Sequence, residues 1–152
     1  PGIARRSAEV ILAEIGLDMS RFPSAAHLCS WAGVCPGNYQ SAGRRKHGKT
    51  TKGNKALKTI LTQCAKSART AKNSYFSAQY QRIAARRGKN RATLAVAHSI
   101  LIAIYHILKN NAEFHDLGAD YYDSFNRDRK INSYLKRLKA LGWEPDAIPG
   151  SA

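Results

Sequence analysis

Residues 54–68 read NKALKTILTQCAKSA and carry the strongest periodic signal in the chain. The apolar residues recur every three or four positions, so they share one face of an α-helix, which turns once in about 3.6 residues. This stripe consists of Leu57, Ile60, Leu61, Cys64, Ala65 and Ala68. Asn54 is a residue type that caps helix N-termini. We therefore expect a helix that begins after Asn54 and buries the stripe.

The opposite face of this predicted helix is basic. It carries Lys55, Lys58, Lys66 and Arg69. An ordinary solvated face mixes charges of both signs, whereas this segment has no acidic residue. We expect this face to bind a nucleic-acid backbone.

Helical spacing recurs in four other segments, and a glycine follows each one, as is usual after a helix C-terminus. Three of them are residues 7–15, 24–32 and 74–87, which are followed by Gly16, Gly33 and Gly88. The fourth contains Ile131, Tyr134, Leu135, Leu138 and Leu141 and is followed by Gly142. Residues 113–125 are acidic and aromatic without this spacing. We expect them to form an irregular connection.

Residues 92–108 read ATLAVAHSILIAIYHIL and contain no charge. A membrane span needs about 20 apolar residues, so this shorter segment with polar members predicts a central buried helix and no membrane. No alternating strand pattern of useful length occurs. With 152 residues, 43% of them hydrophobic, the chain can form one domain with its own core. The predicted fold is all-α, a compact helical domain of about five to six helices with a long basic loop, whose apolar stripes are all used in the core.

The middle of the chain is almost purely positive. Residues 19–112 contain 17 Lys and Arg and no Asp or Glu, and the whole chain has a net charge of +15. Such a segment repels itself, and binding to phosphates offsets the repulsion. The expected partner is DNA or RNA. Because Mg²⁺ is normally held by carboxylates, we expect no metal site in this segment.

Three cysteines, Cys29, Cys35 and Cys64, form no disulfide framework, which favours a reducing, cytoplasmic location. A zinc site that also uses His27 and His47 is the weaker interpretation. Free cysteines are commonly core residues, so small buried thiols are favoured.

Residues 36–54 read PGNYQSAGRRKHGKTTKGN and form the long basic loop. Ser41 is a candidate nucleophile, and the Arg44 and Arg45 guanidinium groups can bind phosphate oxygens beside it. Tyr39 is a competing nucleophile. The loop could also dock phosphates without catalysis, which leaves a non-catalytic DNA- or RNA-binding module as the alternative function.

Residues 43–50 also match the P-loop pattern G-x-x-x-x-G-K-[ST]. That pattern needs a buried strand before it and a helix directly after it. The polar residues ahead and Gly53 behind predict neither, so nucleotide hydrolysis is disfavoured.

Three stretches together resemble one family: PGIARRSAEVILAEIG at residues 1–16, WAGVCPGNYQSAGRRKHGKTTKGNKALK at residues 31–58, and RRGKNRATLAVAHSILIAIYHIL at residues 86–108. They are similar to the C-terminal transposase domain of the IS-one-ten insertion sequences, which are bridge-RNA-guided recombinases. The sequence LKRLKALGWEP at residues 135–145 extends the resemblance. The family more often has glycine directly after the serine, where this chain has Ala42.

The resemblance implies that Ser41 forms a covalent phosphoserine link to DNA, with Arg44, Arg45 and Lys46 stabilising the transition state. It also implies an N-terminal RuvC-like domain, absent from this chain, whose acidic residues hold a divalent metal such as Mg²⁺. The implied partners are DNA, a guide (bridge) RNA and further copies of the full-length protein. We expect the isolated domain to be inactive.

These observations lead to a set of expected sites and boundaries. The expected nucleic-acid-binding residues are Arg44, Arg45, Lys46, Lys49, Lys52, Lys55, Lys58, Lys66 and Arg69. The expected domain spans residues 1–142, followed by a tail at residues 143–152. Residues 1–33 should resemble a helix-hairpin-helix, in which the backbone amides near Gly2 could meet a DNA phosphate.

Overall fold

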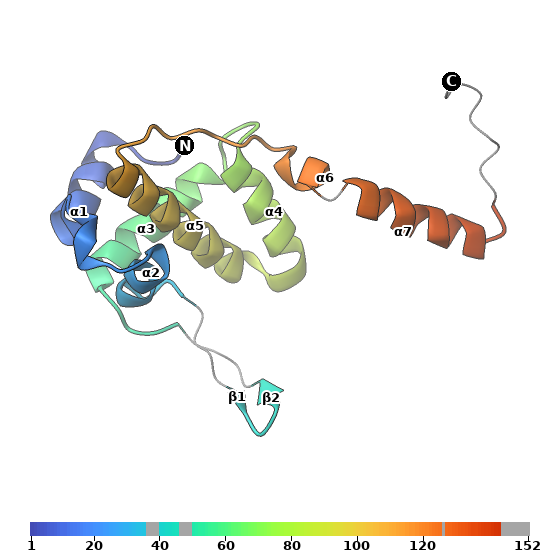
Figure 1. Ribbon diagram of the computed structural model, residues 1–152, viewed down its shortest axis with the longest axis horizontal. Helices are drawn as coiled ribbons and strands as arrows, with labels where there is room; N and C mark the ends of the chain where they lie inside the picture. Colours follow the sequence, from blue (N-terminus) through green and yellow to red (C-terminus); the bar gives the residue numbers. More distant parts are fainter. Residues whose placement is uncertain (36–39, 46–49, 126, 144–152) are drawn as a thin grey trace. The chain divides into compact units, whose positions relative to one another are not determined.

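The structure, a computed structural model, describes residues 1–35, 40–45, 50–125 and 127–143, with the backbone alone at residues 40, 41, 44, 45 and 130. It divides into two compact units, Pro1–Ala119 and Asp120–Ala152. The first contains α1 (Arg5–Ile15), a 3₁₀ turn η1 (Met19–Arg21), α2 (Ala25–Ala32), β1 (Gln40–Ser41), β2 (Arg44–Arg45), α3 (Lys55–Ala68), α4 (Tyr75–Arg87) and α5 (Lys89–Asn110) (Figure 1). The second contains α6 (Tyr121–Phe125) and α7 (Arg127–Ala140).

The all-α prediction is confirmed. The described residues form seven α-helices, against five to six expected, and their extended structure is limited to the two short strands β1 and β2. The expected limits of the domain, residues 1–142 with a tail beyond, stay a prediction.

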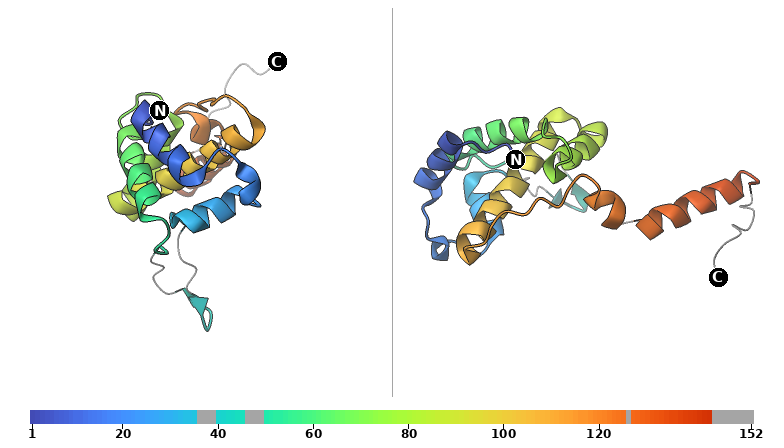
Figure 2. Two further views of the ribbon diagram at one scale, coloured as in Figure 1. Left: turned by 90° about the vertical axis from the view of Figure 1, so that its left-hand side faces the viewer. Right: turned by 90° about the horizontal axis from the view of Figure 1, so that it is seen from above.

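The helix α5 is the centre of the first unit, as its uncharged sequence predicted. It packs against α2, α3, α4 and η1, and α1 packs against α3 (Figure 2). Among the described residues, α5 is also the one helix long and apolar enough to fit a membrane span by length and composition. Its buried residues are Ala92, Thr93, Val96, Ala97, Ile100, Leu101 and Tyr105.

The predicted stripe of α3 faces this core. Leu57, Leu61, Cys64, Ala65 and Ala68 are buried, and Ile60 is partly buried. The Asn54 side chain accepts a hydrogen bond from the backbone N–H of Leu57 at 2.9 Å. The predicted N-cap and the face assignment of this helix are therefore confirmed.

The cap of α4 comes from a residue far along the chain. Ser74 precedes the helix without a capping bond from its side chain. Instead Asp116 Oδ1 accepts the backbone N–H of Tyr75 at 2.9 Å and that of Gly118 at the same distance. Burial raises the pKa of Asp116, but these hydrogen bonds outweigh it and leave the pKa below its usual value.

One expectation for the C-terminal part is wrong. Residues 121–125, expected to be irregular, form α6, in which the rings of Tyr121 and Phe125 stack at 5.8 Å. This pair has the i,i+4 spacing that stabilises a helical turn.

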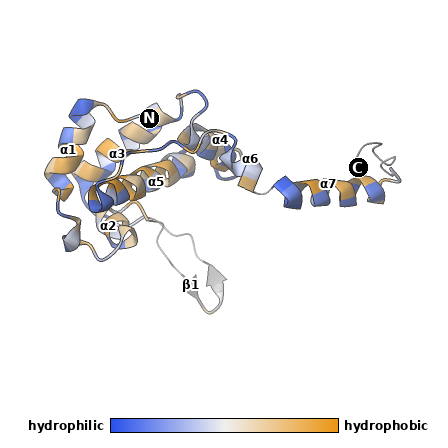
Figure 3. Ribbon diagram, turned by 45° about the horizontal axis from the view of Figure 1, so that its top comes forward, coloured by the Kyte–Doolittle hydropathy of each residue, from blue (hydrophilic) through white to orange (hydrophobic). Residues whose placement is uncertain are grey.

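The apolar stripe of α7 lies in the second unit. Ile131 is 44% exposed and Tyr134 is 59% exposed, so the described part of the second unit does not bury this stripe within itself. The second unit has only α6 and α7 among its described elements, and a single long helix cannot bury its own face. Figure 3 shows the apolar residues along α7.

Candidate functional site: the loop between α2 and α3

The basic loop leaves the core through a defined helix end. Gly33 follows α2 in the left-handed conformation, with φ of 74°. The backbone N–H of Gly33 donates to Ser30 O, and that of Val34 donates to Cys29 O, both at 3.1 Å. These two bonds form a Schellman motif, which ends the helix and turns the chain.

The loop returns to the core directly against this helix end. Gly53 also has a positive φ, 51°. A Cβ atom on Gly53 would lie 2.4 Å from Gly33 N, and one on Gly33 would lie 2.9 Å from Gly53 Cα. Both positions therefore need glycine, because the two backbones cross in direct contact.

Asn54 joins three elements at this crossing. Its backbone N–H donates to Trp31 O in α2 at 3.3 Å, and its side chain caps α3. Its amide Nδ2 also donates to Glu14 Oε2 in α1 at 2.7 Å. One residue thereby ties α1 and α2 to the start of α3.

Lys58 holds the returning segment from the side of α3. Its Nζ donates to Thr50 Oγ1 at 2.7 Å and to the backbone oxygen of Thr51 at 3.3 Å. The ammonium of Lys58 is therefore engaged within the chain.

Residues 40–45 of the loop form a short hairpin. Gln40 pairs with Arg45, and Ser41 pairs with Arg44. The two turn residues, Ala42 and Gly43, have φ of 48° and 74°, and such a pair of positive φ values is typical of a type I′ turn. The turn sets the backbone of Arg44 opposite that of Ser41.

Comparison with known proteins identifies the family of this loop. The model of the family described as "Transposase IS116/IS110/IS902 family" matches residues 1–81. The chain belongs to this transposase family. The matched residues cover α1 to α3, the whole loop and the first half of α4.

One curated relative extends the match beyond the family model. The chain is 32% identical over 117 residues to the "Insertion element IS110 uncharacterized 43.6 kDa protein" of Streptomyces coelicolor. The alignment covers 72% of this chain and 27% of that protein. The chain thus spans about a quarter of its relative's length. No solved structure matches the chain.

The structure distributes the expected binding residues of this family member over several places. Lys46 and Lys49 lie outside the described residues, and Arg44 and Arg45 are described by their backbone alone. Lys52, Lys55 and Lys66 are exposed. Their roles in binding stay a prediction.

Two of the expected binding residues have contacts that sequence reasoning missed. The first is Lys58, which binds Thr50 and Thr51. The second is Arg69, whose guanidinium lies 5.6 Å from the centre of the Tyr80 ring and donates to Tyr80 Oη at 3.3 Å. The sequence analysis also did not predict the contact of Glu14 with Asn54. The paired glycines that flank the loop, Gly33 and Gly53, were a signal that its two ends meet.

The P-loop interpretation does not fit the geometry. Gly43 lies in the hairpin turn, and the next helix begins at Lys55, not directly after Thr50.

The thiols of Cys29 and Cys64 are buried as predicted, and burial raises the pKa of Cys29 to about 12. Cys35 is half-buried, and burial raises its pKa too.

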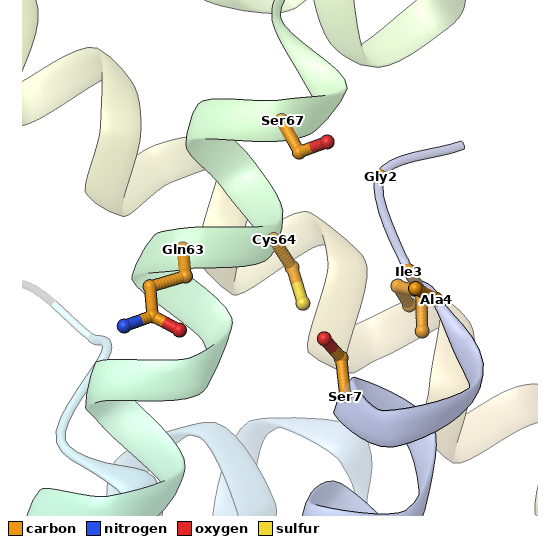
Figure 4. A pocket seen from close by; sticks show the side chains of 7 residues that line it. All are labelled: Gly2, Ile3, Ala4, Ser7, Gln63, Cys64 and Ser67. Atoms are coloured by element: carbon orange, nitrogen blue, oxygen red, sulfur yellow. The ribbon is translucent and has the colours of Figure 1, made fainter.

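The N-terminal segment packs against the C-terminal half of α3. A Cβ atom on Gly2 would lie 2.6 Å from Cys64 O, so this position also needs glycine. An open pocket of about 380 Å³ lies here. Figure 4 shows Ser7 and Gln63 among the residues that line it. Ala4 gives α1 no side-chain cap. Phosphate contact near Gly2 stays a prediction.

Proposed function

We propose that this chain is the domain of a DNA transposase that cuts a DNA strand with Ser41 as the nucleophile. The observation that carries the proposal is the hairpin inside the loop that the family model covers, because its register sets the backbone of Arg44 opposite that of Ser41. A phosphodiester under attack gains negative charge on its non-bridging oxygens, and a guanidinium beside the nucleophile stabilises that charge. Arg45 and Lys46 supply further positive charge next to Arg44.

In the proposed step, Ser41 Oγ forms a bond to phosphorus and loses its proton. The bond between phosphorus and one sugar oxygen breaks, and that oxygen takes up a proton as the hydroxyl of the released end. Rejoining is the reverse reaction with the hydroxyl of another DNA end. Residues 19–112 contain no carboxylate, so any carboxylate that assists lies outside this segment.

The crossing of Gly33 and Gly53 supports this function because it brings together the two ends of the loop that carries Ser41. A reactive group must be held close to its productive position, and rigid elements hold it better than a free loop does. The contacts of Asn54 and Lys58 fix where the loop rejoins α3. They supply the part of the pre-organisation that the described residues contribute.

The remaining parts of the proposal concern the whole protein. Its other domain would be RuvC-like and hold Mg²⁺ on acidic residues, and a guide RNA and further protein copies would complete the assembly. The relative's greater length leaves room for such a domain. The domain alone should then bind DNA without cutting it.

The decisive experiment uses the full-length protein with guide RNA and Mg²⁺. Ser41→Ala should abolish strand cleavage and leave DNA binding nearly unchanged, because the change removes the attacking oxygen and little contact area. Tyr39→Phe should retain cleavage. Ser67→Ala, which removes the hydroxyl of an exposed serine on α3, is the matched control and should also retain it.

The covalent product gives an independent readout. Reaction on a nicked suicide substrate, followed by sequencing of the DNA-linked peptide, should locate the attachment at Ser41. A phosphotyrosine at Tyr39, or full cleavage by Ser41→Ala, would overturn the mechanism. Binding of DNA with no adduct from the wild-type protein would favour the non-catalytic module.

A further inference from the structure

The junction of α4 and α5 concentrates positive charge outside the loop and outside α3. Gly88 alone, with φ of 84°, separates the two helices. Five of the ten residues 82–91 are Lys or Arg, and none is acidic. We name Arg86, Arg87 and Lys89 the α4–α5 corner.

The three side chains of the α4–α5 corner are exposed. Among the residues that the structure describes, none of the three has a hydrogen bond or an ion pair from its side chain. The flanking Arg82 and Arg91 do have contacts within the chain, so they are left out of the corner. The charge of the corner is therefore directed to solvent.

Helix stability does not account for this arrangement. Arg86 and Arg87 suit the C-terminal end of α4, where the helix dipole favours cations. Lys89 stands in the first turn of α5, where the dipole favours acids, and that turn has no acidic residue and no side-chain cap. The sequence thus accumulates cations at a place where they repel one another and one of them opposes its helix.

The α4–α5 corner is also separate from the basic face of α3. Arg69, at the end of α3, rests on Tyr80 in α4. Arg87 lies seven residues further along α4, which corresponds to about 10 Å at the rise of an α-helix. A ligand that contacts both places must be extended and anionic along its length.

We propose that the α4–α5 corner binds the phosphate backbone of duplex DNA, as a second contact apart from the Ser41 hairpin. This inference rests on the proposed function, because membership of a transposase family is what favours DNA as the polyanion. Arginine forks bind phosphate oxygens bidentately, and an exposed corner can contact a duplex without entering its grooves. The contact should therefore be independent of base sequence.

The test measures the affinity of the 152-residue chain for a fluorescent DNA duplex over a range of salt concentrations. The variant R86Q/R87Q/K89Q should bind more weakly, and its slope of log affinity on log salt should be smaller by up to about 2.7, since each phosphate contact contributes about 0.9. Its thermal midpoint should stay close to that of the wild type, because relief of repulsion among the three charges offsets the loss of two cations at the C-terminal end of α4.

The matched control is R129Q/R137Q/K139Q, which removes the same charge from exposed positions of α7. It should retain most of the wild-type slope. Equal slopes for the wild type and the α4–α5 corner variant would overturn the inference, and so would equal losses in both variants, which would indicate a general effect of net charge.

A duplex RNA of the same length forms the second arm. A loss confined to RNA would overturn the assignment to DNA. Failure of the wild-type chain to bind DNA would count against the proposed function as well. Wild-type binding with an unaffected corner variant would reject only the α4–α5 corner.

Discussion

Alanine at position 53 should destabilise the first unit by forcing apart the two ends of the basic loop. Its Cβ would lie 2.4 Å from Gly33 N and 2.5 Å from Ala32 C, about 1 Å closer than ordinary contact allows. These are backbone atoms of a capped helix end, so they cannot rotate away. The positive φ of Gly53 adds roughly 1–2 kcal/mol for a residue with a Cβ, and overpacking adds about 1–3 kcal/mol. We expect Gly53→Ala to lower the free energy of unfolding by about 2–5 kcal/mol.

Urea denaturation followed by circular dichroism measures this loss. Gly88→Ala is the matched control, because Gly88 also has a positive φ but a Cβ there meets nothing within 4 Å. It should lose only the backbone contribution, roughly 1–3 kcal/mol, because φ of 84° with ψ of 162° is a conformation essentially confined to glycine. Equal losses in the two variants would refute the argument that the loop ends are in obligatory contact. In the full-length protein, Gly53→Ala should also reduce strand cleavage.

Three further predictions concern other parts of the chain. Leu61→Asp should unfold the domain in a thermal melt, because it buries an unpaired charge at a position with no exposure. Lys66→Glu should weaken DNA binding with an unchanged thermal midpoint. Equal thermal losses in the two variants would show that the faces of α3 are misassigned. Ala42→Gly should stabilise the hairpin turn, since φ of 48° disfavours alanine; faster amide hydrogen exchange in residues 40–45 of the variant would contradict this. Asp116→Asn should destabilise α4 at neutral pH. Because folding lowers the pKa of Asp116 from 3.8, the stability that its charge contributes is present above that value and is lost as the pH falls through the lower folded pKa. Urea midpoints from pH 7 to pH 2 should therefore converge for the two proteins at the acid end, and a constant gap would argue against the charged cap.

The helices α1, α2 and α3 and their ends were determined locally, and the sequence by itself sufficed for them. The stripe from Leu57 to Ala68 predicted the buried face of α3, and Asn54 predicted its cap. Gly16 and Gly33 ended their helices as expected. Such features depend on residues within one or two helical turns of each other, so periodicity and cap chemistry are enough to predict them.

The contacts between segments far apart in the sequence were decided only by the tertiary structure. Glu14 binds Asn54 across 40 residues, and Asp116 caps α4 across 41. Lys58 was expected to bind DNA, and in the structure its ammonium donates a hydrogen bond to Thr50. The stripe on α7, which the second unit does not bury within itself, has the same periodicity as the buried stripe on α3. A sequence pattern specifies which residues share a face, but the elements that cover that face come from distant parts of the chain, and their approach is set by packing of the whole core.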